Sequence, residues 1–187
     1  RGHPGLSISR TGQPGALTQI RIRGAEANHT LVLIDGIEVN DPATGNEYNF
    51  ANSTHIAIKS VEVIRGPMTS RYGSEAVGGL IAIETLNPAA QEAKATVYAA
   101  TGSKNQQEIA ISAGLVSTAD VQAGLTVNAS GSEGYNVSNF GSEKDGSDRA
   151  NLIGQMDFRV SESLSLGLVV LANQTLAMGD EQDFRFP

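Results

Sequence analysis

The chain has 187 residues, of which 40% are hydrophobic, with no cysteine and a formal net charge of -7 at pH 7. This length permits one or two domains with a sizeable core, and the lack of cysteine excludes a disulfide scaffold and thiolate chemistry. The negative charge argues against a nucleic-acid partner, because no basic stripe is available to neutralise phosphates.

The chain begins with Arg1-Gly-His-Pro, without a methionine or a signal-peptide pattern, and it stops directly after a well-patterned segment. We therefore expect it to be part of a larger protein. It contains no run of about 18 apolar residues, so no transmembrane helix is predicted. A membrane location stays open, since a membrane-spanning strand needs only about 9–11 residues of alternating character.

The first 88 residues read as a small mixed domain. Residues 6–10 and 18–23 alternate polar and apolar side chains, which predicts two short strands around a turn rich in glycine and proline. Residues 31–34 are continuously apolar, as expected of a strand covered on both faces. Asp35-Gly36 predicts a hairpin turn that pairs residues 37–39 back. A long polar loop follows over residues 40–52, and residues 54–59 fit one helical turn with Ile56 and Ile58 facing inward.

Two further strands are predicted at residues 61–64 and 80–84, around a compact segment that contains Gly73, Gly78 and Gly79. These glycines are either ordinary loop residues or positions where the backbone closely approaches a surrounding wall. Arg23 and Arg65 each follow a β-like run and precede a glycine. They fit ordinary surface arginines at strand ends, or a pair of guanidinium groups held for partner carboxylates.

From residue 89 onward the sequence alternates with a period of two. Five segments follow this pattern: residues 93–101, 107–115, 121–130, 151–160 and 164–172. Their length suits a bilayer-spanning strand, whereas a soluble antiparallel sandwich, which alternates equally, usually has strands of about 5–6 residues. The absence of tryptophan and an aromatic content of 5% count against a membrane barrel, which normally carries aromatic girdles.

The connections between these segments differ in length. Residues 117–120 and 161–163 are tight turns, whereas residues 131–148 form a long polar loop rich in glycine. Short turns on one rim and long loops on the other are typical of outer-membrane barrels. On that basis residues 103–106, residues 131–148 and the segment after residue 174 lie outside the cell.

Catalytic patterns are weak in this chain. His3, His29 and His55 are scattered without a metal-binding or nucleophile spacing, and Ser74 lacks the glycine-flanked elbow of a hydrolase. We therefore do not expect an enzyme. A soluble or surface-exposed β-rich binding or adhesion module without transport activity remains the alternative.

Residues 17–88 resemble the plug domain of TonB-dependent outer-membrane receptors. The motifs that carry the resemblance are Ile20-Arg-Ile-Arg-Gly24, Leu31-Val-Leu-Ile-Asp-Gly-Ile-Glu-Val39, Val61-Glu-Val-Ile-Arg-Gly-Pro67 and Tyr72-Gly-Ser-Glu-Ala-Val-Gly-Gly79. The sequences of these motifs are most similar to the cobalamin-receptor branch of this family, whereas the later strands match the family only in their alternating pattern. The resemblance implies a mixed α/β plug domain over residues 1–88 and the first strands of an antiparallel transmembrane β-barrel over residues 89–187. The complete barrel would have about 22 strands.

The resemblance also implies a function, which is energy-coupled uptake of a scarce nutrient such as a ferric siderophore or cobalamin across the outer membrane. The implied partners are the TonB energy-coupling protein, whose binding box would precede Arg1, a metal-chelate or corrinoid ligand, and outer-membrane lipid. Arg23 and Arg65 would lock the plug to barrel glutamates. The implied ligand-binding residues of the outer plug loops are Gln13, Asp41, Thr44, Asn46, Glu47 and Tyr48.

No cofactor is expected apart from a candidate structural calcium ion. Receptors of this branch bind calcium through aspartates of their outer loops, and oxygen-rich clusters suit this cation. The corresponding residues here are Glu143, Asp145 and Asp148. A solvated acidic loop explains the same residues, and Lys144 among them weakens the calcium interpretation.

Overall fold

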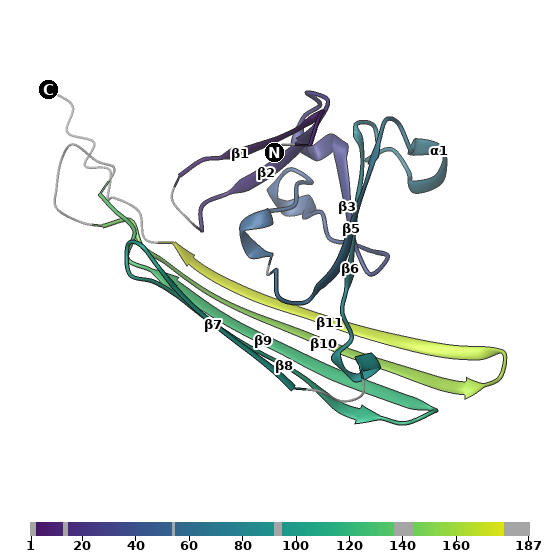
Figure 1. The fold of residues 1–187 in the computed structure, drawn as a ribbon. Helices are drawn as coiled ribbons and strands as arrows, with labels where there is room; N and C mark the ends of the chain where they lie inside the picture. The colour runs from purple at the N-terminus through teal and green to yellow at the C-terminus, as the bar shows by residue number, and fades with distance from the viewer. Residues whose placement is uncertain (1–2, 13–14, 54, 92–94, 137–143, 178–187) are drawn as a thin grey trace, which may run out of the picture.

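A computed structural model describes residues 3–12, 15–53, 55–91, 95–136 and 144–177. It contains three antiparallel or mixed sheets, of two, four and five strands. The five-stranded sheet forms a long curved wall, and the N-terminal domain lies against its concave side (Figure 1).

The N-terminal domain holds the two smaller sheets. Strands β1 (Leu6–Arg10) and β2 (Thr18–Ile22) form an antiparallel pair. The four-stranded sheet has the order β4-β3-β6-β5, in which only β3 and β6 run parallel. Its strands are β3 (Thr30–Ile34), β4 (Ile37–Glu38), β5 (Ile58–Arg65) and β6 (Gly79–Thr85). Asp35 and Gly36 have φ angles of 49° and 81°, as the predicted hairpin turn between β3 and β4 requires.

The helices of this domain are short. They are the 3-10 helices η1 (Ala27–His29), η2 (Pro42–Thr44), η3 (Phe50–Asn52) and η4 (Pro88–Gln91), and the α-helix α1 (Thr69–Tyr72). None of the helices in the described ranges is long and apolar enough to cross a membrane. The helical turn predicted over residues 54–59 is wrong, because Ile58 already begins β5 and pairs with Thr85. Pairing along β6 and the β-branched side chain of Ile58 favour the strand there.

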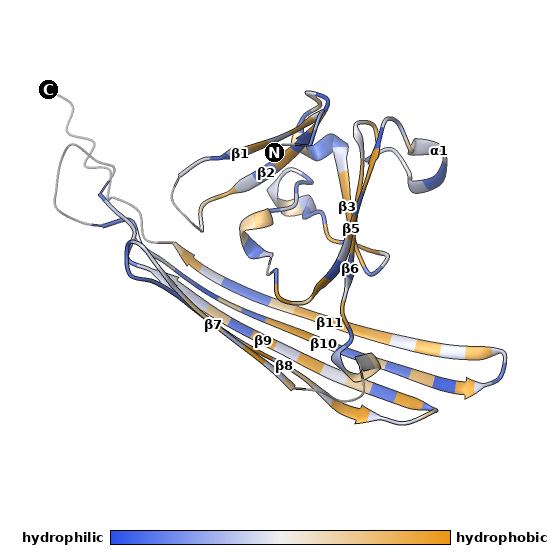
Figure 2. Ribbon diagram, viewed as in Figure 1, coloured by the Kyte–Doolittle hydropathy of each residue, from blue (hydrophilic) through white to orange (hydrophobic). Residues whose placement is uncertain are grey.

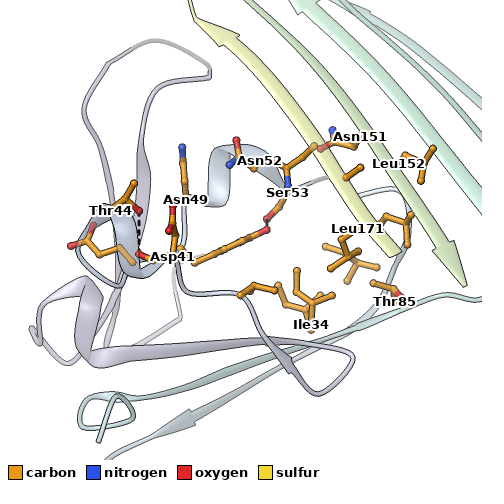
Figure 3. Close-up of a pocket in the computed structure, with 18 of the residues that line it drawn as sticks. Ile34, Asp41, Thr44, Asn49, Asn52, Ser53, Thr85, Asn151, Leu152 and Leu171 are labelled. Carbon is orange, nitrogen blue, oxygen red and sulfur yellow. Dashed lines mark hydrogen bonds between the residues drawn. The ribbon is translucent and has the colours of Figure 1, made fainter. Parts of the chain in front are cut away.

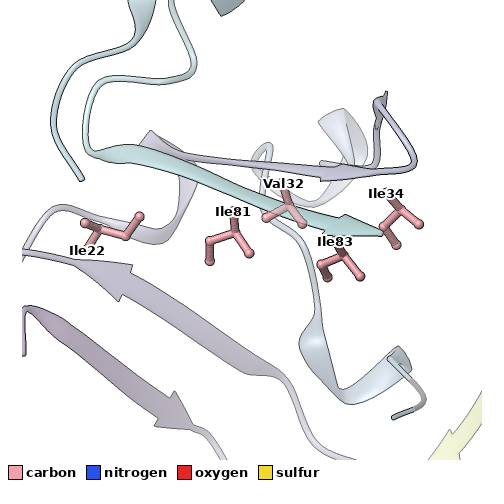
Figure 4. Packing of buried hydrophobic residues seen from close by; sticks show 5 residues of the cluster. All are labelled: Ile22, Val32, Ile34, Ile81 and Ile83. Atoms are coloured by element: carbon pink, nitrogen blue, oxygen red, sulfur yellow. The ribbon is translucent and has the colours of Figure 1, made fainter. Parts of the chain in front are cut away.

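The core of the domain lies on both faces of β3, whose five residues are all buried. Alternate side chains enter two clusters, one with Val32 and Ile34 and the other with Leu31 and Leu33. Figure 4 shows the first cluster, which is completed by Ile22, Ile81 and Ile83. Full burial of one such side chain contributes about 1.5–3 kcal/mol. The prediction of a strand covered on both faces is therefore confirmed.

Gly79 explains how β6 approaches β5 so closely. A Cβ atom on Gly79, whose φ is 149°, would lie 2.3 Å from the carbonyl oxygen of Ile64 and 2.8 Å from Ile22 Cδ1. A Cβ on Gly78 would meet Ala25 at 2.8 Å. Gly78 and Gly79 therefore make close backbone approaches inside the N-terminal domain, whereas a Cβ atom on Gly73 would meet nothing within 4 Å.

The wall consists of the five predicted strands, several of them longer than predicted. They are β7 (Ala95–Gly102), β8 (Gln106–Ser117), β9 (Val121–Ser132), β10 (Ser147–Ser161) and β11 (Leu164–Ala177). Each strand pairs antiparallel with the next, giving the order β11-β10-β9-β8-β7. The turn at residues 103–106 is as tight as those on the opposite rim, with Lys104 and Asn105 at positive φ. The difference between the rims in the described chain therefore rests on the connection between β9 and β10.

The two faces of the wall differ in chemistry. One cross-strand row is Val97, Ile111, Val127, Leu152 and Ala172, and the next row is Tyr98, Ala110, Asn128, Asn151 and Asn173. Val127 is 42% exposed, whereas its neighbours Thr126 and Asn128 are 2% and 3% exposed because they face the N-terminal domain. Figure 2 shows this alternation along the strands. The apolar face meets no second sheet in the described ranges, which is the reverse of a sandwich.

Candidate functional site

A chain of hydrogen bonds joins the N-terminal domain to the middle of the wall. The Asp35 carboxylate accepts hydrogen bonds from the Thr85 backbone N–H, at 2.8 Å, and from the Thr85 hydroxyl. The same hydroxyl accepts a hydrogen bond of 2.6 Å from Gln155 Nε2. The hairpin turn after β3, the end of β6 and strand β10 are thus connected through one buried threonine.

The segment that links the domain to the wall is docked on the wall's inner face. Asn87 donates to Asp157 at 2.8 Å, and the Ser117 hydroxyl donates to the carbonyl oxygen of Ala89 at 3.0 Å. A Cβ atom on Gly124 of β9 would lie 2.6 Å from two ring carbons of Pro88. The glycine therefore makes the space that the linker fills. The predicted domain boundary after residue 88 falls within this docked helix, η4.

A second group of contacts lies nearer the other rim of the wall. Thr175 donates to Asn52 Oδ1 at 2.9 Å, and Arg149 reaches the carbonyl oxygen of Ala51 at 3.4 Å. His55 lies 3.8 Å from a carboxylate oxygen of Glu108. Helix η3 and His55, which lies shortly after it, are therefore held against the wall at this end.

Between these two groups of contacts lies a cavity of about 600 Å³ (Figure 3). Its volume is in the range of ligand pockets in proteins. Apolar residues of the N-terminal domain, such as Ile34 and Ile83, line one part, and Ile153 and Leu171 of the wall line another. Its polar lining consists of Asp41, Thr44, Glu47, Tyr48, Asn49, Asn52, Ser53, Thr85, Asn151 and Asn173.

The loop over residues 40–49 is fixed by two asparagines that the sequence analysis did not single out. Buried Asn40 accepts a hydrogen bond from the Val32 N–H at 2.8 Å and donates to the carbonyl oxygens of Thr30 and Asn46 at 3.1 and 2.9 Å. Asn49 accepts from the N–H groups of Thr18 and Ala51, both at 3.0 Å. Asparagine directly after a short strand is a frequent turn residue, so its type alone did not predict this role.

Tyr48 closes one side of the cavity. Its ring packs edge-to-face on Phe50, with centroids 4.9 Å apart, and its hydroxyl lies 3.1 Å from the Ser53 hydroxyl. Burial raises the pKa of the Tyr48 phenol above its ordinary value of 10.0, although the hydrogen bond with Ser53 opposes this shift. The phenol is therefore a neutral hydrogen-bonding group at the cavity surface.

Four of the six predicted ligand-binding residues lie together at this cavity: Asp41, Thr44, Glu47 and Tyr48. Asp41 caps helix η2 by accepting from the Ala43 N–H at 2.9 Å, and Glu47 accepts a hydrogen bond from Gln19. Asn46 is in the same loop at a φ of 63°, but it does not line the cavity. Gln13 lies outside the described residues.

Arg23 and Arg65 are both exposed; Arg23 directly follows β2, and Arg65 is the last residue of β5. Arg23 has a φ of 51°, and its backbone N–H donates to Gly5 at 2.7 Å. Neither guanidinium group forms an ion pair or a side-chain hydrogen bond within the described part of the chain. The locking role of these arginines stays a prediction.

The predicted calcium ligands are only partly described. Glu143 lies outside the described residues, Asp145 is buried, and Asp148 is exposed on β10. No group of three or more histidine, cysteine or acidic residues that could hold a metal ion occurs among the described residues. The nearby Glu133 is bonded instead to Lys144 and Asn105, at 2.6 and 3.0 Å, which lowers the pKa of Glu133. Calcium binding therefore stays a prediction.

The described chain thus has a small domain on the polar face of an antiparallel wall whose other face is apolar. Residues 1–80 match the family model described as TonB-dependent Receptor Plug Domain. Over 165 residues the chain is 30% identical to the vitamin B12 transporter BtuB of Vibrio vulnificus. The aligned region covers 87% of this chain and 27% of that protein. Residues 1–80 thus match a TonB-dependent receptor plug domain, and most of the chain is similar in sequence to a member of that receptor family.

Solved structures agree with this assignment of the fold. The siderophore receptor PirA from Acinetobacter baumannii has a TM-score of 0.74 and 22% identity, over 96% of this chain and 29% of PirA. The ferric yersiniabactin uptake receptor FyuA from Yersinia pestis has a TM-score of 0.70 and 18% identity, over 94% of this chain and 28% of FyuA. The chain therefore spans under a third of the length of the relatives that it matches.

Proposed function

We propose that this chain is the plug and the first wall strands of an outer-membrane receptor for energy-coupled uptake of a scarce nutrient, such as cobalamin or a ferric siderophore. The observation that carries the proposal is the two-faced wall, which presents Asn128 and Asn151 to the plug and Val127 and Leu152 to the outside. Lipid is the surrounding that stabilises such an apolar outer face. The names of the related proteins support receptor and transport activity.

In this proposal the wall is part of a barrel of about 22 strands that surrounds the plug, residues 1–88. The TonB energy-coupling protein supplies the force that displaces or remodels the plug. Arg23 and Arg65, exposed at strand ends, bind carboxylates of other barrel strands. No covalent chemistry is needed, because differential affinity of the ligand for two plug conformations is sufficient to drive the change.

Ligand binding is assigned to the outer plug loops. Asp41, Thr44, Glu47 and Tyr48 support this assignment because the loop gathers them at one cavity, and Gln13 and Asn46 belong to the same proposed surface. A calcium ion held by Glu143, Asp145 and Asp148 would order the adjoining outer loop. A soluble adhesion module is disfavoured, because exposed Val127, Leu152 and Leu168 would leave its surface prone to aggregation.

Growth of a deletion strain tests the proposal. A strain that lacks the gene is expected to stop growing when limiting vitamin B12 is its sole source of cobalamin or when a limiting ferric siderophore is its sole source of iron. Removal of the energy-coupling protein is expected to cause the same loss, and the complementing gene is expected to restore growth only when that protein is present. Unchanged uptake of both nutrient classes in both strains would refute the proposed function.

A further inference from the structure

A chain of side-chain hydrogen bonds crosses the inner face of the wall and ends at the cavity. Asn151 Nδ2 donates to Asn128 Oδ1 at 3.1 Å, and Asn128 Nδ2 donates to a Glu108 carboxylate oxygen at 3.0 Å. These residues belong to β10, β9 and β8, and Asn128 in the middle is 3% exposed. His55 of the plug lies 3.8 Å from the same Glu108 oxygen. The chain thus runs from a plug contact to Asn151 in the lining of the cavity (Figure 3).

Glu108 and a backbone carbonyl fix the direction of this chain. An ionised carboxylate and a carbonyl oxygen accept hydrogen bonds without donating any, whereas an amide accepts at one end and donates at the other. Asn128 Nδ2 donates both to Glu108 and, at 3.4 Å, to the carbonyl oxygen of Ile109. A reversed Asn128 amide would place its oxygen against these two acceptors. Asn128 therefore presents its oxygen to β10, and Asn151 directs its Nδ2 toward that oxygen.

The orientation of Asn151 decides what the wall offers to the cavity. Its Nδ2 is bonded to Asn128, so its Oδ1 lies at the other end of the amide group. Asn151 and its cross-strand partner Asn173 both line the cavity. An amide that is already held in one orientation loses less conformational entropy on binding than one that rotates freely. An oxygen held in this way suits an N–H or O–H group of a ligand.

We propose that Asn128 and Glu108 are positioning residues, which hold the Asn151 amide with its oxygen presented to a hydrogen-bond donor of the ligand. Neither Asn128 nor Glu108 lines the cavity, so both act through Asn151. The role toward a ligand rests on the proposed function. The orientation of Asn151 does not, because it follows from the hydrogen bonds of the wall itself.

Two variants separate this role from packing, because all their side chains keep nearly the same size. In Asn128→Asp the new carboxylate faces Glu108 without a donor between them, which is repulsive and should release Asn151. In Glu108→Gln/Asn128→Asp the glutamine donates to the new carboxylate, which still accepts from Asn151. Both variants lose the longer bond to Ile109, so they differ only in the group at position 108.

The first measurement needs no ligand. Isotope labelling of asparagine, in the protein as its natural gene encodes it and in detergent micelles, gives the hydrogen-exchange rate of the Asn151 side-chain amide by NMR. The signal is assigned by its loss in Asn151→Ser. We expect exchange to accelerate about tenfold or more in Asn128→Asp and to return to within about threefold of the natural rate in the double variant. Unchanged exchange in Asn128→Asp, or no recovery in the double variant, would overturn the proposal.

The second measurement is the affinity of the same proteins for vitamin B12 and for a ferric tris-catecholate. For a probe that the natural protein binds, we expect Asn128→Asp to weaken binding by about five- to tenfold, as the loss of one positioned hydrogen bond does. The double variant is expected to restore the affinity to within about threefold. Natural affinity in Asn128→Asp would overturn the role toward the ligand.

A charge-matched control is Asn128→Asp/Glu62→Gln, because Glu62 is an exposed residue of plug strand β5. It has the same net charge as the double variant but keeps the two carboxylates on the wall face to face, so it should bind as weakly as Asn128→Asp. Recovery of binding in this control would overturn the proposal, because net charge would then explain the effect. Binding of neither probe would count against the proposed function, while the exchange rates would still decide the orientation of Asn151.

Discussion

Gln155 of the wall donates a hydrogen bond of 2.6 Å to the hydroxyl of Thr85, the buried last residue of plug strand β6. Because the Thr85 hydroxyl has one proton, it donates this proton to Asp35 and accepts from Gln155 at the same time. The plug's hairpin turn and the wall are therefore coupled through a single oxygen atom.

Replacement of Thr85 by valine keeps the side-chain shape and removes this oxygen. We expect Thr85→Val to destabilise the plug by about 2–3 kcal/mol, because the Asp35 carboxylate and Gln155 amide both lose a partner. Urea unfolding of the plug, followed by a probe on that domain, measures the change. In a double-mutant cycle of Thr85→Val with Gln155→Leu, the two effects on stability are expected to be non-additive. The control cycle combines Thr85→Val with Gln122→Leu, because Gln122 is on the same face of the wall but outside this chain of hydrogen bonds, and its effects are expected to be additive. Additive effects in both cycles would contradict the coupling.

Gly124 is expected to tolerate no side chain. A methyl group there would overlap the Pro88 ring, with a carbon–carbon distance of 2.6 Å, so the linker must shift. We expect Gly124→Ala to cost about 1–3 kcal/mol, as overpacking usually does. Gly154→Ala is the matched control, because its added methyl would lie 3.8 Å from Val170, an ordinary contact. Thermal unfolding of the two variants compares them, and equal stability of both would show that Pro88 is not seated on Gly124.

Asn40 holds the candidate ligand loop from beneath through three hydrogen bonds. We expect Asn40→Leu to destabilise the plug by about 2–4 kcal/mol, since buried backbone groups lose their partners. Hydrogen exchange of the backbone N–H groups of Asp41 and Asn46 should accelerate, because both are bonded within this loop. Asn28→Ala is the control, since the Oδ1 atom of Asn28 is buried without a partner. An unchanged rate of hydrogen exchange in Asn40→Leu would contradict the proposed role of Asn40 in holding the loop.

Tyr48 makes a prediction about alkaline pH. Its pKa in the folded protein is raised by burial, so the folded state holds the phenol proton more tightly than the unfolded state. The resulting stability is fully present below pH 10.0 and is lost as the pH rises through the raised value. Tyr48→Phe removes the ionisable group, so its unfolding free energy should fall less steeply above that pH than that of the natural protein. Tyr72→Phe controls for the number of tyrosines, and parallel pH curves for Tyr48→Phe and the natural protein would contradict the prediction.

Local patterns predicted most of the strands of this chain. The apolar run 31–34 and the period-two segments after residue 89 are set by which faces of a strand are buried, and this information is contained in neighbouring residues. The helical turn over residues 54–59 failed because pairing between Ile58 and Thr85, 27 positions apart (85 − 58), decides the conformation there. Strand ends were also misplaced, since cross-strand hydrogen bonds extend β10 and β11 into polar residues that show no clear alternation.

The candidate site was predictable only in part. The resemblance to the plug family implied Asp41, Thr44, Glu47 and Tyr48 as ligand-binding residues, and the loop does gather these four at one cavity. The wall residues Asn151 and Asn173 on the opposite side could not be assigned, because their place depends on how the plug sits in the wall. Thr85 and Gly124 could not be predicted for the same reason, because their roles depend on contacts with Gln155 and Pro88.

The central claim is that the wall faces lipid on one side and the plug on the other, and adjacent residues of β11 test it most directly. Ala172 and Asn173 are both exposed but belong to opposite faces, and the chain has no cysteine that would compete for a label. Spin labels on single cysteines at these positions are compared in membranes for collision with oxygen, which partitions into lipid, and with a water-soluble nickel chelate. We predict that the Ala172 label collides mainly with oxygen and that the Asn173 label does not. An Ala172 label that is reached by the nickel chelate as readily as the Asn173 label, or shielded from oxygen, would contradict the account.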